Sequence, residues 1–384
     1  MESCMNSKHL LCYLLLIIGM TGPTAFGKHP STSGIDEKYF LHPMICMDSK
    51  GVDCSKLKLG DSYLSTSSPA RGKLYSCNPK NPSAPGSRAE RITWIDFINN
   101  KWNLFEKLWL PEGNFRTPEG TYSETITEGG RKIKINNVPK DSKIGDWPMN
   151  KHQILTEIDA NPGVPAVKSL NFLFAKQPVW SDSPGCLSLG AIGITNNGVV
   201  LYSAADARGN DALAHEIVDI YGGHPARDEY HYHFIPERLD DQRLETGHSG
   251  VVGWILDGFP IHGYYGIGGK EMINEDLDEC HGHQHGSIGY HYHATMEYPY
   301  TVGCYRGKIQ QITSKKLDQR RSAGDDPPRN NSGVNRLNVI ADQLGVNVEE
   351  LRRAVGPPPP NFKRAARILK IDEEQLRIIF KKYR

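Results

Sequence analysis

The tetrapeptide Tyr-His-Tyr-His occurs twice in this chain, at residues 230–233 and 290–293. A Gly-His pair precedes each copy, at residues 223–224 and 282–283. In a β-strand, residues i and i+2 point to the same side of the sheet. The pattern therefore predicts two related units, each with a turn followed by a strand that has its histidines on one face and its tyrosines on the other.

Paired imidazoles at this spacing can chelate a divalent ion. Two such strands lying side by side would supply four nitrogens, and Asp257 in a turn-like sequence could add a carboxylate. We therefore predict a site for zinc or copper with these ligands: His231, His233, His291, His293 and Asp257. Second-tier candidates for the same site are His224, His283, His262, Asp278 and Glu279.

Other interpretations of these residues stay open. The histidines could form a hydrogen-bonded network without a metal, or one of them could act in catalysis without a metal. His281, His283 and His285 alternate in the same way, but their glycine neighbours favour an exposed loop. The acidic run at residues 276–279 lacks the ligand spacing of an EF-hand, so calcium is a less favoured ion than zinc or copper.

The N-terminus indicates the compartment. Residues 1–27 carry Lys8 and His9, then an apolar run from Leu10 to Met20, and end in small residues. This is the pattern of a secretory signal peptide, and the apolar run is shorter than the ~20 residues that cross a bilayer. We expect cleavage near Gly27 and a secreted, extracellular protein with no membrane span.

Six cysteines remain after the signal peptide, and an even number in an oxidising compartment predicts three disulfides. Six cysteines permit fifteen connectivities, so the sequence does not choose among them. Closing the shortest loops first would give Cys46 with Cys54, Cys280 with Cys304 and Cys77 with Cys186. Thiolate ligation of a metal is disfavoured because no C-x-x-C pair is present.

The 38 glycines and 25 prolines favour many turns and short strands over long helices. Together with local patterns they predict an α+β chain, with a mainly-β core domain and a small C-terminal helical hairpin region. The expected parts are a signal peptide (1–27), a loop-rich cysteine-containing region that docks by its tryptophans (28–118), the mainly-β domain (119–311), a linker (312–335) and a helical repeat (336–384). Within the β domain we expect a tight turn at residues 196–198 and one short helix over residues 211–220.

The tail is internally repeated, with Asn347 and Asp372 as expected N-caps of the second helix in each unit. Residues 312–384 hold 16 Lys and Arg against nine Asp and Glu, a formal charge of +7. We expect the helical tail to pack on itself or to bind an anionic matrix polymer, and we do not expect it to bind nucleic acid, because a secreted chain meets little of it. Asn330 begins a sequon and is a predicted glycosylation site.

Several strings in a fixed order resemble the YHYH-domain family of secreted proteins. They are G-G-H-P (222–225), the first tetrapeptide, D-G-F-P-I (257–261), L-D-E-C (277–280), the second tetrapeptide and T-V-G-C-Y-R-G (301–307). The resemblance covers about residues 120–307 and implies a domain boundary and an extracellular setting, but no particular activity. His262 stands where the family often has Tyr.

These features lead to three hypotheses. The first is an extracellular metal-binding protein, and the second is a structural component of an extracellular or mineralised matrix. The third is a zinc-dependent hydrolase or hydratase, in which three imidazoles leave one position open for water. Catalytic residues stay unknown, and catalysis ranks below binding because no serine-hydrolase, nucleotide-binding or zincin motif occurs.

Overall fold

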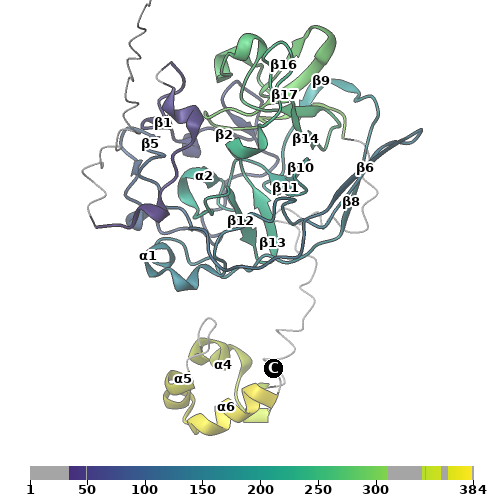
Figure 1. Cartoon of the computed structure of the whole chain (residues 1–384). Coiled ribbons are helices and arrows are strands. Elements are labelled where there is room, and N and C mark those ends of the chain that lie inside the picture. The colour runs from purple at the N-terminus through teal and green to yellow at the C-terminus, as the bar shows by residue number, and fades with distance from the viewer. Residues whose placement is uncertain (1–33, 49, 310–339, 342, 356–361, 383–384) are drawn as a thin grey trace, which may run out of the picture.

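The structure, a computed structural model, describes residues 34–48, 50–309, 340–341, 343–355 and 362–382. The predicted signal peptide, the predicted linker and the sequon at Asn330 lie outside these residues. The described part is mainly β, with short helices in the body and a helical C-terminal region (Figure 1). The predicted α+β class is confirmed.

An eight-stranded sheet forms the centre, in the order β12-β13-β11-β10-β14-β15-β17-β16. Its strands are β10 (Ala191–Thr195), β11 (Val200–Tyr202), β12 (Gly223–Ala226), β13 (Glu229–Tyr232), β14 (Val251–Ile255), β15 (Pro260–His262), β16 (Gly282–His285) and β17 (Gly289–His293). The first tetrapeptide lies at β13 and the second on β17, so the predicted strand positions of both copies are confirmed.

The sheet consists of two equivalent units of four strands, each built around one copy of the tetrapeptide. In the first unit Leu201 on β11 pairs in parallel with Tyr232 on β13, and in the second Ile261 on β15 pairs in parallel with Tyr292 on β17. The hairpins β12-β13 and β16-β17 are both antiparallel. The strand order of the second unit mirrors that of the first, which gives the sheet an approximate two-fold symmetry.

The two units meet at the antiparallel pair β10-β14. Ile194 on β10 lies opposite Trp254 on β14, and these two residues occupy equivalent positions in the two units. Gly193 and its equivalent Gly253 lie where the strands are closest, since an added Cβ would approach the carbonyl oxygens of Trp254 and Ile194 to 2.6 and 2.3 Å. Only glycine allows this approach of the two backbones.

Equivalent turns follow β10 and β14. The predicted turn at 196–198 is confirmed, because Gly198 has a φ of +86° and its N–H donates to the carbonyl of Thr195. Gly258 in the second unit has a φ of +93°. Both angles lie in the left-handed region, where glycine has no steric penalty.

The tyrosines of the tetrapeptides are buried on the face opposite their histidines, and each hydroxyl has a partner. Tyr230 donates to Asp219 at 2.8 Å, and its equivalent Tyr290 donates to Asp278 at 3.0 Å. Buried hydroxyls need such partners, and here they fix the face on which each ring lies.

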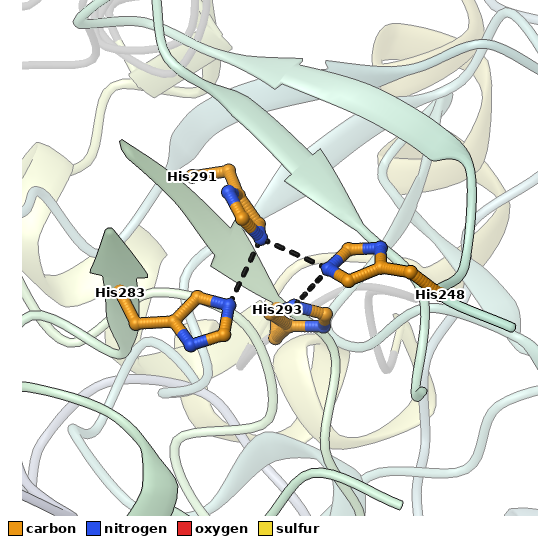
Figure 2. A group of neighbouring side chains, drawn as sticks. All are labelled: His248, His283, His291 and His293. Atoms are coloured by element: carbon orange, nitrogen blue, oxygen red, sulfur yellow. Dashed lines mark hydrogen bonds between the residues drawn. The ribbon is translucent and has the colours of Figure 1, made fainter. Parts of the chain in front are cut away.

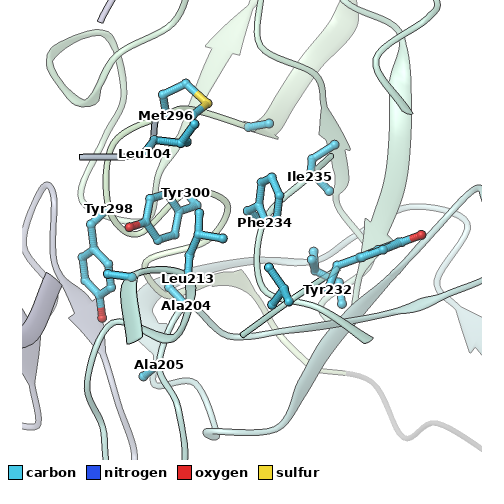
Figure 3. Packing of buried hydrophobic residues seen from close by; sticks show 14 of the residues in the cluster. Leu104, Ala204, Ala205, Leu213, Tyr232, Phe234, Ile235, Met296, Tyr298 and Tyr300 are labelled. Carbon is cyan, nitrogen blue, oxygen red and sulfur yellow. The ribbon is translucent and has the colours of Figure 1, made fainter. Parts of the chain in front are cut away.

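The second tyrosine of each copy reaches the turn of its own unit. Tyr292 donates to Asp257 at 2.6 Å, while Tyr232 accepts from Asn197, which occupies the same place in the first unit. Tyr232 packs beside Phe234 and Ile235 in the main core (Figure 3). The tyrosines thus anchor both strands, as their alternation predicts.

The N-terminal region shares this core. Trp94, Trp102 and Trp109 are buried in the same hydrophobic cluster as the tyrosines, and Trp94 donates from its indole N–H to the carbonyl of Ala214. The prediction of three disulfides is confirmed, and the pairs, which the sequence left open, are those that close the shortest loops first: Cys46–Cys54, Cys77–Cys186 and Cys280–Cys304.

Smaller sheets surround the centre. They are β1 (Leu57–Lys58) with β5 (Lys101–Trp102) and β4 (Ile95–Asp96), β2 (Leu64–Ser65) with β3 (Leu74–Tyr75), β6 (Tyr122–Thr127) with β7 (Gly130–Ile135) and β8 (Leu170–Phe174), and β9 (Trp180–Gly185) with β18 (Tyr305–Gly307). The body also contains the short helices α1 (Gln153–Thr156) and α2 (Ala212–His215). None of the helices in the described ranges has the length and apolar character needed to cross a bilayer.

Helix α2 is shorter than the helix predicted over 211–220. Asp211 caps its N-terminus by accepting from the N–H of Ala214, but Glu216 has an extended backbone with ψ near 149°. The chain leaves the helix at this residue, and the Glu216 side chain approaches the histidines of the first unit.

The C-terminal helices are α4 (Val348–Val355), α5 (Phe362–Leu369) and α6 (Glu373–Lys382), and they enclose a hydrophobic cluster of their own. The predicted caps are confirmed: Asn347 accepts from the N–H of Glu350, and Asp372 accepts from the N–H of Gln375. Gly345 and Lys370, which stand at equivalent positions of the two repeats in the tail, both have positive φ.

Candidate metal centres

The histidines of the sheet gather in two separate groups. Cluster A consists of His224, His231 and His233, and cluster B consists of His248, His283, His291 and His293. The prediction of one site between neighbouring strands is wrong, because β11, β10, β14 and β15 separate β13 from β17. Each tetrapeptide instead meets the histidine of its own preceding strand.

In cluster A, strands β12 and β13 bring three imidazoles together. The Nε2 atom of His233 lies 3.1 Å from Nε2 of His231 and 3.2 Å from Nε2 of His224. All three side chains are buried. The second-tier candidate His224 thus lies with the two predicted ligands.

Backbone carbonyls fix the tautomers of this cluster. Nδ1 of His231 lies 3.0 Å from the carbonyl oxygen of Glu229, and Nδ1 of His233 contacts the carbonyl of Ser203 at 2.5 Å. A carbonyl oxygen only accepts, so both Nδ1 atoms carry the proton and both Nε2 atoms carry a lone pair when the rings are neutral. Two lone pairs face each other at 3.1 Å, an arrangement that a bound cation would stabilise.

A carboxylate completes cluster A. Oε2 of Glu216 lies 3.4 Å from Nε2 of His224 and 3.6 Å from Nε2 of His233. Burial, and then the nearby carboxylates of Asp206 and Asp159, raise the pKa of Glu216 well above its usual value. Three imidazole nitrogens and one carboxylate oxygen form a donor set suited to a divalent transition metal.

Cluster B has four imidazoles from β16, β17 and the loop before β14 (Figure 2). The Nε2 atom of His291 lies 3.0 Å from that of His283 and 3.1 Å from that of His248. The Nε2 atom of His293 lies 3.2 Å from that of His248. All four rings point toward one small volume.

The tautomers of cluster B follow the same rule. Nδ1 of His291 donates to the carbonyl of Gly289, and Nδ1 of His293 donates to that of Gly263. His248 donates from Nδ1 to the carbonyl of Ser249 at 2.7 Å. Three neutral rings therefore direct Nε2 lone pairs at one another, and these groups could hold a metal ion.

The histidines of both clusters are difficult to protonate, so a proton would not take the place of a metal ion between them at neutral pH. Burial lowers the pKa of His233 to about 4, and burial together with neighbouring imidazoles lowers that of His291 to about 3. The pKa values of His231 and His293 lie well below the usual range for the same reasons. At neutral pH these rings are uncharged and available as ligands.

His262 lies beside cluster B without being part of the group. Its Nδ1 donates to the carbonyl of Ser249, which also accepts from His248, and its ring centroid is 4.5 Å from that of His291. The equivalent residue in the first unit is Tyr202, whose ring stacks on His231 with centroids 3.9 Å apart. An aromatic ring thus covers the first tetrapeptide histidine in both units.

The predicted carboxylates lie elsewhere. Asp257 accepts from the hydroxyl of Tyr292 and from the N–H of Gly307, on the face away from the histidines, so it takes no part in either cluster. Asp278 and Glu279 both pair with Arg306.

Asp276 and His281 also lie outside both clusters. Asp276 pairs with Lys270, so the structure does not assemble the run into a calcium loop. His281 is buried rather than exposed and contacts Thr295.

Sequence reasoning missed Glu216 and His248, the fourth member of each group. Neither has a counterpart in the other cluster, since cluster B consists of histidines alone and Ser188 stands in the first unit where the second has His248. The end of α2 brings Glu216 to cluster A, and the loop before β14 brings His248 to cluster B. Both placements depend on tertiary structure, and no local sequence pattern carries them.

The model of the YHYH protein family matches residues 171–275. This confirms the resemblance over a stretch that begins in β8 and ends after β15, shorter than the strings in the sequence indicate. The match includes the first tetrapeptide and ends before the second. Comparisons with curated proteins and with solved structures found no match.

Proposed function

We propose that this protein is an extracellular metal-binding protein with two mononuclear centres, one at each Tyr-His-Tyr-His strand. Centre A has His224, His231, His233 and Glu216 as ligands, and centre B has His248, His283, His291 and His293. The observation that carries the proposal is the convergence of Nε2 atoms at 3.0 to 3.2 Å in each cluster. In five of the seven rings, those of His231, His233, His248, His291 and His293, the Nδ1 proton is donated to a backbone carbonyl, so the Nε2 lone pair is free for a metal ion.

The donor sets favour zinc or copper. Imidazole nitrogen is a common ligand of both ions, and the hydrogen bonds from Nδ1 orient the rings as in known metal sites. Calcium and magnesium prefer oxygen ligands, of which each centre offers one at most. The three disulfides are consistent with an oxidising, extracellular setting.

The number of protein ligands favours a structural or storage role over hydrolysis. Zinc enzymes keep one position open for water, whereas structural zinc sites have four protein ligands. Three buried imidazoles meet at centre A with the Glu216 carboxyl group 3.4 and 3.6 Å from two of them, and four imidazoles, three of them buried, meet at centre B. A hydrolase or hydratase would need Glu216 or one histidine to leave the ion.

Metal analysis tests the proposal. The protein is purified without an affinity His-tag, supplied with zinc or copper, desalted and analysed by mass spectrometry of the metals. We expect two equivalents per chain. Variants with His231 and His233, or His291 and His293, changed to Ala should each retain one equivalent, and the fourfold variant should retain none.

A matched control uses His42→Ala with His152→Ala, because both histidines lie outside the clusters and bind Glu37 and Asp146 instead. This control should keep two equivalents. If the wild-type protein and the fourfold variant both contain no metal, the proposal is wrong, and the histidines form a hydrogen-bonded network.

A further inference from the structure

The two centres differ in how the surrounding chain covers them. A segment before β8 lies along the β12-β13 hairpin: the N–H of Val164 donates to the carbonyl of Arg227, and that of Ala166 donates to the carbonyl of Asp228. Asn161 also donates from its side chain to the carbonyl of Pro225. This segment covers the edge of the sheet next to centre A.

Centre B has an open edge. In the part of the chain that the structure describes, strand β16 is the last strand of the sheet and pairs with β17 alone. Among the described residues, no backbone hydrogen bond from another segment reaches residues 284–288. A Cβ added to Gly286 or Gly289 would meet no atom within 4 Å, so the hairpin turn projects into open space.

The ligands differ in exposure accordingly. The side chains of His224 and His233 in centre A are 4% and 3% exposed. In centre B, His283 on the edge strand is only partly buried, although His248, His291 and His293 are buried. His283 is therefore the one ligand of centre B that a solvent molecule can reach directly.

A further imidazole stands just outside this ligand. His285 is partly exposed, shares a face of β16 with His283, and has its ring centroid 6.0 Å from that of His283. The equivalent position in the first unit is Ala226, which has no ligand atom. Centre B thus has a histidine that extends from the buried ligands toward solvent, and centre A does not.

We infer that centre B is an exchangeable metal site, loaded and emptied across the open edge of β16 with His285 as a transient ligand, whereas centre A retains its ion. This inference rests on the proposed function, because it requires both centres to bind metal. An ion that leaves His283 first can bind His285 before it is hydrated fully. A transient ligand of this kind speeds entry and exit equally and leaves the affinity unchanged.

A chelator challenge tests the inference. The two-equivalent zinc protein is mixed with a chromogenic pyridylazo chelator at pH 7, and the release of zinc is followed by absorbance. We expect one equivalent to leave in a fast phase and one in a slow phase. His283→Ala should remove the fast phase alone, and His224→Ala should remove the slow phase alone.

The role of His285 is tested by His285→Ala. We expect the fast phase to slow by about 10-fold, which corresponds to about 1.4 kcal/mol of lost stabilisation of the ion as it passes between His283 and solvent. The affinity of centre B, measured by equilibrium competition, should stay the same. The control is Gln284→Ala, on the same strand and exposed on the opposite face, which should change neither quantity.

Each outcome decides a separate point. Two equivalents that leave in one phase would overturn the inference but leave the proposed function intact. An unchanged rate in His285→Ala, or an affinity lowered in step with the rate, would show that His285 is not a transient ligand. Absence of metal from the wild-type protein would refute the proposed function itself. Near-UV circular dichroism checks that each variant is folded.

Discussion

At the scale of single residues, the backbone determines what the histidines can bind. Carbonyls of the same unit take the Nδ1 protons of His231 and His233 in centre A, and of His291 and His293 in centre B. The Nε2 atoms are left with lone pairs directed inward. Because this preorganises the ligands before an ion arrives, little ordering of side chains is needed on binding.

Glu216→Gln should weaken metal binding at centre A alone. The substitution keeps the size of the side chain but replaces the carboxyl group, whose Oε2 lies 3.4 Å from Nε2 of His224, with an amide that cannot become negatively charged when a metal ion binds. We expect the affinity of centre A to fall at least about 10-fold, as for loss of supporting groups at other sites. Competition titration of the two centres measures this, and an equal fall at both centres would contradict it.

Acid should destabilise the metal-free protein. An unfolded chain protonates histidine near pH 6.5, whereas burial lowers the pKa of His233 to about 4 and that of His291 to about 3 in the folded state. The folded state therefore binds fewer protons in this window. The free energy of unfolding falls as the pH falls below 6.5, by up to about 1.4 kcal/mol per pH unit for each such histidine.

Urea unfolding of the metal-free protein at pH 7, 6 and 5 measures this dependence. Changing His233 and His291 to Ala should make it shallower. A stability that stays constant over the three pH values would show that these histidines titrate normally.

Tyr292→Phe should lower stability without removing a ligand. The buried carboxylate of Asp257 would lose the hydroxyl that donates to it at 2.6 Å. Leaving such an acceptor short of a donor costs about 1 to 3 kcal/mol. Thermal unfolding measures the loss, with Tyr63→Phe as control because that ring lies under Lys58 and is only partly buried. Equal melting temperatures for both variants would contradict the anchoring role of Tyr292.

At the scale of elements, the alternation of Tyr and His was enough to predict both strands and their two faces. It did not predict which strands are neighbours. Four strands separate β13 from β17, because each hairpin adds to a parallel partner in its own unit. Pairing of this kind is non-local, so the spacing of the two tetrapeptides along the chain says nothing about it.

Elements that depend on contacts between near neighbours in the sequence were predicted well. The turn at Gly198 and the caps at Asn347 and Asp372 involve contacts between near neighbours in the sequence, which a local pattern can carry. The helix over 211–220 was overestimated because Glu216 leaves it to reach the histidines.

The metal ligands, too, could be predicted only where a local sequence pattern marks them. The tetrapeptides themselves identified four of the proposed ligands, and the Gly-His pairs added His224 and His283 as second-tier candidates. Glu216 and His248 could not be found in this way, because a helix end and a distant loop bring them to the histidines. Asp257 was included as a carboxylate in a turn-like sequence, but the sequence does not tell where such a carboxylate points, and here it accepts from the hydroxyl of Tyr292.

Gly193→Ala should test the contact between the two units. A Cβ there would lie 2.6 Å from the carbonyl oxygen of Trp254, so β10 and β14 would have to move apart. Overpacking of this kind costs about 1 to 3 kcal/mol. Gly190→Ala is the control, since a Cβ there meets no atom within 4 Å. Chemical denaturation should show a loss for the first variant only, and similar losses for both would contradict the close approach.

At the scale of the whole molecule, the C-terminal part of the chain differs from the rest both in its charge and in its hydrophobic core. The C-terminal helices have their own hydrophobic cluster, and residues 312–384 carry a formal charge of +7 while the rest carries −6. We keep the prediction that the basic C-terminal helices bind an anionic matrix polymer.

Removal of residues 312–384 tests this division. The shortened protein should keep its metal content and the melting temperature of the body within about 2 °C, since none of the tail's described residues belongs to the main core. It should lose retention on a heparin column, which the full chain should show at low salt and lose as salt rises. Equal retention of both forms would place the anionic-polymer site in the body.

The near-symmetric pairing of β10 with β14 has an evolutionary consequence. Ile194 lies opposite Trp254, its equivalent in the second unit. The backbone hydrogen bond from the N–H of Asn196 to the carbonyl of Val252 also has an equivalent, from the N–H of Leu256 to the carbonyl of Ile192. A two-fold rotation that superimposes the two units exchanges these two bonds. A homodimer of shorter polypeptides would be joined in this manner across its dyad. Fusion of two such genes would need only a connection between the end of one copy and the start of the next, after which each copy could acquire its own fourth ligand.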